Sequence, residues 1–571
     1  MSNETLLPMA YKHGTYVESK TGDGDAIVAK VNVYHPDGRV EPTMRIHRNV
    51  PRDFYVAKAG HRNYTDKLEW LEEKKLQRFT TTERDMNKNI MRALQMTPGF
   101  NMSRKMLFRN PYVFGGDIDI TCILGQQYAQ RWPDKAHERS TVAVIDIEAD
   151  VLHGTKQIIM CTVTFKDRVY SAITHEFAKT LDNPEQYFYD KVDEHIGELI
   201  RKRNIKLDIE IVDTPGVAAK RCIEHAHRWK PDFLTLWNLD FDMPIIFRAL
   251  EDDGYDLEDV FSDPDIPKDL RYFYYKRGLT RKQKASGEYM SIPPAEQWHT
   301  VFCPASFYII DAMPVYRILR RVDGMQPSYS LDFITKLELG EGKLLFKDPD
   351  ENVEEGGLDW HRMMQRKHKG VYLAYNIIDC IRIEELDEKT TDLCSKIGIL
   401  KTVSHYKDFN SNPRRICDQL HFYLKDKGFV IGTTSDSMVG ELDKYVVDMG
   451  GWIITLSPVL IEEFGIKLVD DLLRDSMFYI HNADLDIVST YPKVGIMLNI
   501  SKETCVLELA QIQGVNGTER RSIGINLTGG KTNALILATR VLKVKQPTDL
   551  LPDFDKWLEE HSISSDKAMA A

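Results

Sequence analysis

Residues 141 to 237 alternate strand-like and helix-like segments, and no other feature restricts the fold of this chain as strongly. Strand patterns occupy residues 141–147, 157–165, 167–173 and 233–237, and amphipathic helix patterns occupy 184–203 and 217–229. Such alternation is typical of an α/β domain, in which helices cover a sheet. Farther along, residues 301–310 favour a strand, and residues 313–321 and 361–388 favour helices. We therefore expect an α/β fold in this part of the chain.

The length of the chain predicts several domains. A single hydrophobic core cannot serve all 571 residues, so roughly two to four domains are expected. The composition becomes polar near residues 131–135, and its texture changes again after residue 400. We expect an N-terminal α+β domain at 1–139, the α/β domain at 140–385, a helical return to the N-terminal domain with a linker at 386–440, and a further domain at 441–571.

Local patterns outside the α/β region give three more expectations. The first thirty residues are polar and predict a loosely ordered arm that leads into a strand at 26–34. Residues 67–78 have helical periodicity with mixed charge. Residues 444–456 and 476–485 suggest a new sheet.

The composition argues against a membrane-spanning protein, a secreted protein and a nonspecific polyanion binder. No apolar run of about 18 residues occurs, and residues 1–10 lack a signal peptide, so we expect a cytoplasmic protein, in an infected host cell if it is viral. The eight cysteines are scattered and predict reduced thiols. A net charge of −11 argues against nonspecific polyanion binding, but it does not exclude DNA, because a nuclease can gather carboxylates at its centre.

Two acids at the end of the first strand indicate a metal-ion site. Alternate side chains of a strand share one face, so Asp146 and Glu148 are expected to project together. Two neighbouring carboxylates repel each other unless cations neutralise them. The Asp-x-Glu pattern alone occurs often by chance in a chain with 86 acidic residues, so its meaning depends on further acids.

Further acids follow at positions typical of catalytic groups. Asp242 comes directly after the strand at 233–237 and just before Pro244, which suits the first turn of a helix. Tyr375 and Asp379 are spaced i and i+4 on a predicted helix and would share one face. Acids in this order, on a strand, a junction and a helix, predict a two-metal site that cuts phosphodiester bonds.

These motifs resemble those of the DEDD exonucleases of the tyrosine subclass, the proofreading domains of family B DNA polymerases. The resemblance implies an RNase H-like fold and 3′→5′ exonuclease activity with two Mg²⁺ or Mn²⁺ ions held by Asp146, Glu148, Asp242 and Asp379. It further implies that Tyr375 acts in catalysis and that Asn238 and Phe241 contact the DNA strand. Only two residues separate Asn238 from Phe241, a shorter spacing that is similar to protein-primed phage polymerases.

A later segment, Asp-Ile-Val-Ser-Thr-Tyr-Pro at 486–492, is similar to motif A of the family B polymerase palm. The resemblance implies that Asp486 is a catalytic metal ligand, that Ser489 approaches the nucleotide phosphates and that Tyr491 excludes a ribose 2′-hydroxyl. Further similarity to T-even-type phage polymerases covers most of residues 50 to 505, including Gly342 and Lys343. It assigns residues 441–571 to a partial palm with the start of the fingers.

The motifs that complete a palm are missing after Asp486. Neither K-x-x-x-N-S-x-Y-G nor D-T-D occurs there, and two-metal nucleotidyl transfer needs a second carboxylate. We therefore expect the N-terminal part of a phage-type family B DNA polymerase that degrades single-stranded 3′ ends by itself. DNA synthesis on a primer-template would need a partner chain, and a sliding clamp is a further possible partner. Two alternatives are a stand-alone exonuclease and a noncatalytic DNA-binding or scaffold subunit.

Overall fold

The computed structural model describes residues 7–65, 67–96, 102–283, 288–321, 324–348 and 353–433, together with the backbone of three later strands. The chain divides into two compact units, Met1–Gly450 and Gly451–Ala571. In the second unit, β19 (Cys505–Gln513), β20 (Glu519–Leu527) and β21 (Gly530–Thr532) form an antiparallel sheet. The strands expected at 444–456 and 476–485 lie outside the described residues.

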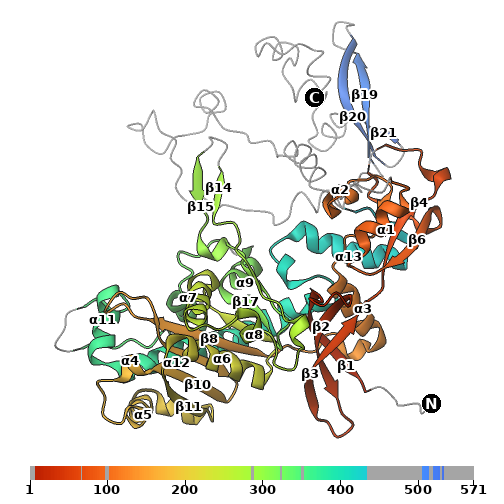
Figure 1. The fold of residues 1–571 in the computed structure, drawn as a ribbon. Coiled ribbons are helices and arrows are strands. Elements are labelled where there is room, and N and C mark those ends of the chain that lie inside the picture. The colour runs from red at the N-terminus through yellow and green to blue at the C-terminus, as the bar shows by residue number, and fades with distance from the viewer. Residues whose placement is uncertain are drawn as a thin grey trace, which may run out of the picture. The chain divides into compact units, whose positions relative to one another are not determined.

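The largest sheet of the described residues, named the central sheet, has six strands with helices packed against it (Figure 1). It contains β8 (Val142–Ala149), β9 (Ile158–Phe165), β10 (Arg168–Thr174), β11 (Lys206–Val212), β12 (Phe233–Leu236) and β17 (Tyr308–Asp311). Their order is β11-β10-β9-β8-β12-β17, and β9 alone runs antiparallel to the other five. The predicted α/β fold is thereby confirmed, with strand ends close to those expected.

Helices cover both faces of this sheet. One face packs against α6 (Pro215–Trp229) and α7 (Leu239–Asp252), and the other against α5 (Pro184–Lys202), α11 (Leu358–Lys367) and α12 (Lys369–Thr390). Every residue of β9 is buried, because a strand covered on both faces needs apolar side chains in both directions. The helix expected at 361–388 is two helices, α11 and α12, which meet at His368.

The region after β12 contains shorter elements. They are α8 (Leu257–Phe261), β13 (Tyr274–Lys276), the hairpin of β14 (Arg281–Gln283) and β15 (Tyr289–Ser291), β16 (Thr300–Phe302), α9 (Ala312–Leu319) and α10 (Leu331–Leu339). The strand expected at 301–310 is divided into β16, which pairs with β13, and β17, which pairs with β12. Pro304 lies between them and has no N–H for a strand ladder.

Three small sheets form the N-terminal region. The first contains β1 (Met9–Glu18), β2 (Asp25–Tyr34) and β3 (Val40–Arg48), and α3 (Ile120–Arg131) packs on it. The second contains β4 (Arg52–Ala57), β6 (Leu76–Thr81) and β7 (Val113–Phe114), beside α1 (Met86–Ala93) and α2 (Arg104–Phe108). The third pairs β5 (Trp70–Glu72) with β18 (Phe429–Ile431), which follows α13 (Asn412–Asp426).

Two N-terminal expectations were wrong for the same physical reason. Residues 9–18 are not a loose arm but the largely buried strand β1, since α3 covers its apolar side chains. Residues 67–78 contain β5 and β6 instead of a helix, because β5 pairs with β18 and β6 pairs with β4. In both places a partner distant in sequence outweighs the local periodicity.

Buried charges join the N-terminal sheet to the central sheet. Asp232 lies directly before β12, and its carboxylate is 3.1 Å from Nζ of Lys12 and 2.7 Å from Nζ of Lys30. Both lysine side chains are only 1% exposed.

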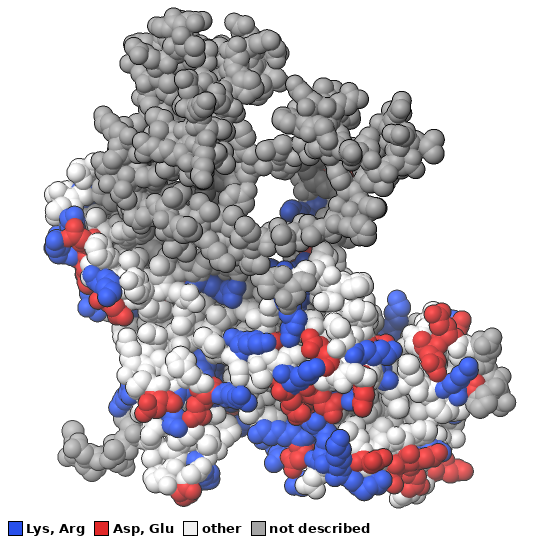
Figure 2. All heavy atoms as spheres, turned by 180° about the vertical axis from the view of Figure 1, so that it is seen from behind, with Lys and Arg blue, Asp and Glu red and all other residues white. Residues whose placement is uncertain are grey.

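Elsewhere, Lys and Arg are intermixed with Asp and Glu over the described surface seen in Figure 2. None of the described helices has the length and apolarity needed to cross a bilayer.

Candidate metal centre

The strand β8 presents two acids to one of the helices that cover the sheet. Ile145 and Ile147 pack into the core beside α6 and α7. Since successive side chains of a strand point to opposite faces, Asp146 and Glu148 face the other layer, where α12 lies. The pleat of β8 thus separates apolar packing from a polar centre within four residues.

The helix α12 supplies the opposite wall of the centre. Tyr375 and Asp379 are one turn apart, and both are buried. Asp146, Glu148 and Asp379 each offer one carboxylate oxygen, and these oxygens all lie within 4.8 Å of one another. The structure therefore brings together acids that are more than 200 residues apart in sequence.

Asp242 lies in the first turn of α7, where its side chain is buried, and its charge interacts with those of Asp146 and Glu148, but its carboxylate is not among the three that lie within 4.8 Å of one another. The helix begins earlier than its sequence suggests, because Asp311 of β17 accepts hydrogen bonds from the backbone N–H groups of Asn238, at 3.1 Å, and Leu239, at 2.8 Å. Asn238 adopts a left-handed conformation, with φ of 83°. Pro244 consequently lies inside the helix and not in its first turn, which corrects the expectation for this residue.

Burial and mutual repulsion change the acidity of these carboxyl groups. Burial raises the pKa of Asp146 to about 7, and the charge of Asp379 adds to the rise. Burial and then the charge of Asp146 raise the pKa of Glu148 well above its ordinary value, and the pKa of Asp242 rises in the same way. A cation bound among these groups would relieve the repulsion.

Lys343 also belongs to the centre. A lysine is not a typical ligand of Mg²⁺, so its residue type alone does not indicate a place in a metal site. Its Nζ lies 2.8 Å from the Tyr375 hydroxyl oxygen and forms an ion pair with Asp379. Burial would lower the pKa of Lys343, but Asp379 and Tyr375 raise it well above its usual range. In the sequence, Gly342 and Lys343 lie in a charged connection and are part of the similarity to T-even-type polymerases. That similarity does not by itself place either residue in the site.

The residues of the centre fit a hydrated divalent cation. Two buried oxygens at the centre, Oδ1 of the acid Asp379 and Oδ1 of the neighbouring Asn376, have no hydrogen-bond partner among the described residues. Oxygen ligands of this kind suit Mg²⁺ and Mn²⁺ rather than softer metals. Asp146, Glu148, Asp242 and Asp379 are therefore the residues that would hold such ions.

A cavity of about 570 Å³ opens onto the centre. Its lining includes Asp146, Asp379 and Asn238, with aromatic and apolar walls formed by residues such as Trp237 and Tyr329. The Trp237 indole N–H donates to the backbone oxygen of Tyr329 at 2.9 Å, which fixes the ring. Phe241, in the first turn of α7, is 65% exposed and is free to contact another molecule.

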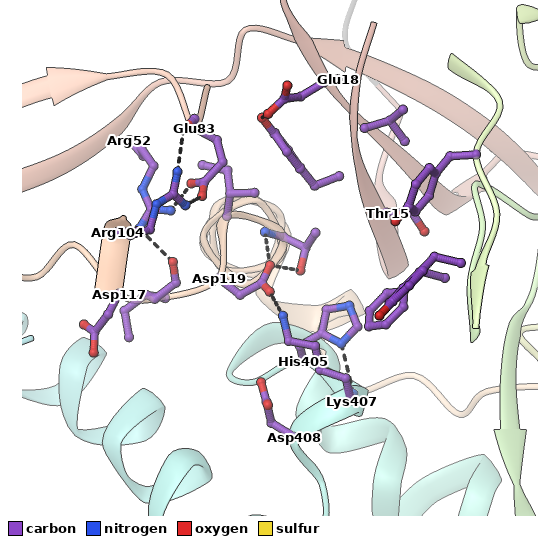
Figure 3. A pocket seen from close by; sticks show the side chains of 18 of the residues that line it. Thr15, Glu18, Arg52, Glu83, Arg104, Asp117, Asp119, His405, Lys407 and Asp408 are labelled. Carbon is purple, nitrogen blue, oxygen red and sulfur yellow. Dashed lines mark hydrogen bonds and ion pairs between the residues drawn. The ribbon is translucent and has the colours of Figure 1, made fainter. Parts of the chain in front are cut away.

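A larger cavity, of about 980 Å³, lies between the N-terminal region and residues 271–276 and 405–414 (Figure 3). Several of its acids are matched by cations: Glu83 pairs with Arg52 and Arg104, Asp119 pairs with Lys407, and Asp117 pairs with Arg414. Paired acids of this kind do not need a metal ion for neutralisation. At β8 and α12 the three clustered acids have a single ion-pair partner among the described residues, Lys343, so that cluster is the better metal centre.

The three residues assigned to a palm, Asp486, Ser489 and Tyr491, lie outside the described residues. Their roles stay predictions.

The acidity of the centre predicts a pH-dependent stability. The pKa of Asp146 is 3.8 ordinarily and about 7 in the fold, so the metal-free folded protein binds its proton more tightly than the unfolded chain. Stability in a chelator should therefore fall by about 2 kcal/mol between pH 5 and pH 7.5. Excess Mg²⁺ should raise the melting temperature more at pH 7.5 than at pH 5, and Asp146→Asn should weaken this difference. Equal shifts at both pH values would contradict the prediction.

Comparison with known proteins indicates a relationship to DNA polymerases. No protein-family model matches the chain. It is 25% identical over 171 residues to the DNA-directed DNA polymerase of Escherichia phage RB69, a stretch that covers 29% of this chain and 15% of that protein. The similarity indicates a relationship to a DNA polymerase over less than a third of this chain and a small part of that protein.

Proposed function

We propose that this chain is a 3′→5′ DNA exonuclease of the DEDD type, tyrosine subclass, within a phage-type family B DNA polymerase. The observation that carries this proposal is the meeting of Asp146, Glu148 and Asp379 within 4.8 Å, with Tyr375 on the same helix as Asp379. The similarity to a phage DNA polymerase supports DNA as the substrate. The central sheet, with β9 alone antiparallel, supports an RNase H-like fold.

The chemistry follows from the donor set. Two Mg²⁺ or Mn²⁺ ions held by Asp146, Glu148, Asp242 and Asp379 would supply the Lewis acidity for in-line attack of a water on the terminal phosphate and for stabilisation of the leaving oxygen. Glu148 and the Tyr375 hydroxyl orient the water and the scissile phosphate. Asn238, which lines the cavity, and the exposed Phe241 ring, in the first turn of α7, contact the last nucleotides of the strand.

Degradation of end-labelled single-stranded DNA tests the direction and the metal requirement. With a 5′ label, we expect a ladder that shortens from the 3′ end in Mg²⁺ and stops in a chelator. With a label on the 3′-terminal nucleotide, labelled mononucleotide should appear from the start of the reaction. Release of a 5′-terminal label as the first product would exclude the proposed direction, and no degradation at all would favour a noncatalytic scaffold.

The remaining parts of the chain belong to the same proposal. Residues 1–139 form an N-terminal domain, 140–385 the exonuclease, 386–440 a return to the N-terminal domain and 441–571 part of a palm containing Asp486. DNA synthesis then requires a partner chain with the second palm carboxylate. Extension of a primer on a template by the purified chain would contradict this arrangement.

Lys343 is expected to act in catalysis by stabilising negative charge on the phosphate, since its ammonium group lies beside Tyr375 and Asp379. Lys343→Met should lower kcat about 100-fold, as measured in single-turnover degradation of labelled DNA. Lys343→Arg should restore part of the rate because it keeps the charge. Lys336→Met, which removes an exposed cation paired with Asp332, is the control and should leave kcat unchanged. A change in KM alone would assign Lys343 to binding.

A further inference from the structure

Two side chains of α12 hold the two acids of β8 by direct hydrogen bonds. Nδ2 of Asn376 donates to Oδ2 of Asp146 at 2.7 Å. The hydroxyl of Tyr372 donates to Oε2 of Glu148. Each acid of the strand therefore has its own donor on the helix, separate from the Lys343 contact to Asp379.

The spacing of the donors matches the spacing of the acids. Tyr372 and Asn376 are four residues apart, which is about 6 Å along a helix. Asp146 and Glu148 are two residues apart, which is about 6.7 Å along a strand. Because the later helix residue meets the earlier strand residue, α12 runs antiparallel to β8 at this contact, and both bonds form in one register.

The Tyr372 hydroxyl is itself held in place. Its oxygen lies 2.8 Å from Nδ1 of His361. Since its single hydrogen goes to Glu148, the phenol accepts this second bond from the His361 ring N–H. The Tyr372 ring stacks on the Tyr375 ring, with centroids 5.8 Å apart and planes 9° apart. The Tyr372 side chain is thus held at its hydroxyl by His361 and at its ring by stacking on Tyr375.

The chain after β8 is anchored to the neighbouring helix α11. Gln365 is fully buried; its Nε2 donates to the backbone oxygen of Ala149 at 2.9 Å, and its Oε1 accepts from the N–H groups of Val151 and Leu152 at 3.0 Å. These bonds fix the chain at Ala149, the last residue of β8, and at the two residues Val151 and Leu152, just beyond Glu148. Both the backbone and the side chain of Glu148 are therefore positioned by residues from α11 and α12.

We propose that Tyr372 and Asn376 are positioning residues that set the separation of the Glu148 and Asp146 carboxylates for divalent-cation binding. Without these donors, the two acids repel each other and turn apart, so a cation must order them as it binds. The inference rests on the proposed function, since it concerns the same centre. Neither residue touches the DNA or the reacting atoms in this role.

Mn²⁺ affinity of the full chain without DNA, measured by electron paramagnetic resonance, tests the role directly. Tyr372→Phe removes only the hydroxyl and should weaken Mn²⁺ binding about 10- to 100-fold. Raising the Mn²⁺ concentration should restore the exonuclease rate of this variant. The matched control is Tyr170→Phe, which removes another buried hydroxyl that donates to a glutamate, Glu210, at 2.5 Å, and it should leave the affinity unchanged.

Asn376→Leu removes the donor to Asp146 at nearly constant volume and should weaken Mn²⁺ binding to a similar degree. If this variant does not fold, Tyr372→Phe decides the question alone. Wild-type affinity in Tyr372→Phe, with binding lost in the Asp146→Ala, Glu148→Ala double variant, would overturn the positioning role and leave the exonuclease proposal intact. Absence of Mn²⁺ binding by the wild-type chain would overturn both.

Discussion

Replacement of Asp146 and Glu148 by alanine in one double variant is expected to abolish metal-dependent degradation of the 3′ end. The rate should fall by at least about 10⁴-fold, equivalent to about 5.4 kcal/mol of transition-state stabilisation. The physical reason is that both carboxylates belong to a buried cluster whose repulsion only cations can relieve. The measurement is single-turnover degradation of labelled single-stranded DNA in saturating Mg²⁺.

The chain contains its own matched control for this experiment. The same Asp-Ile-Glu pattern recurs at Asp208 and Glu210 on the edge strand β11. Asp208 is exposed there and Glu210 accepts a hydrogen bond from Tyr170, so the Asp208→Ala, Glu210→Ala variant should degrade DNA at the wild-type rate. An unchanged rate in the double variant Asp146→Ala, Glu148→Ala would contradict the assignment of the metal site.

Asp232→Ala is expected to lower the free energy of unfolding by about 3–5 kcal/mol, since it leaves two buried lysines without their anion. Lys12 and Lys30 lie within 3.1 Å of the Asp232 carboxylate, and both are almost fully buried. Burial lowers the pKa of Lys30 to about 8 even with Asp232 present. Asp232 also accepts the backbone N–H of Thr141 at 2.9 Å, so the start of β8 loses a bond as well.

Chemical denaturation followed by fluorescence measures this loss. The control is Glu194→Ala, which breaks an exposed ion pair with Lys191 on α5 and should change stability by less than about 1 kcal/mol. A similarly small loss in Asp232→Ala would show that the N-terminal sheet and the central sheet are joined mainly by apolar packing. Partial recovery at higher pH, where a lysine sheds its proton, would support the buried-charge explanation.

The strands and helices of the central sheet were largely predictable from the sequence. Strand β9 is buried along its whole length and mostly apolar because helices cover both faces, and α6 keeps a helical apolar stripe because one face meets the sheet. Prediction failed at β1, which pairs with the adjacent β2 but is buried by the distant helix α3, and at β5, whose strand partner β18 lies far away in the sequence. Local periodicity carries no information about such partners.

The candidate site was predictable only in part. A strand places Asp146 beside Glu148 and a helix places Tyr375 beside Asp379, because these spacings follow from backbone geometry alone. Lys343 was not predictable, since a loop brings it into the centre. The early start of α7, which positions Asp242, depends on the carboxylate of Asp311 about 70 residues later.

The amino-acid sequence by itself determined the α/β pattern and the local pairing of chemical groups on each element, since periodicity and residue type act over a few residues. Only the tertiary structure decided which of two identical Asp-Ile-Glu segments faces other acids. One lies on the inner strand β8 opposite α12, and the other lies on the edge strand β11. The reason is physical: strand order and helix packing, which depend on contacts distant in sequence, determine which carboxylates are buried together.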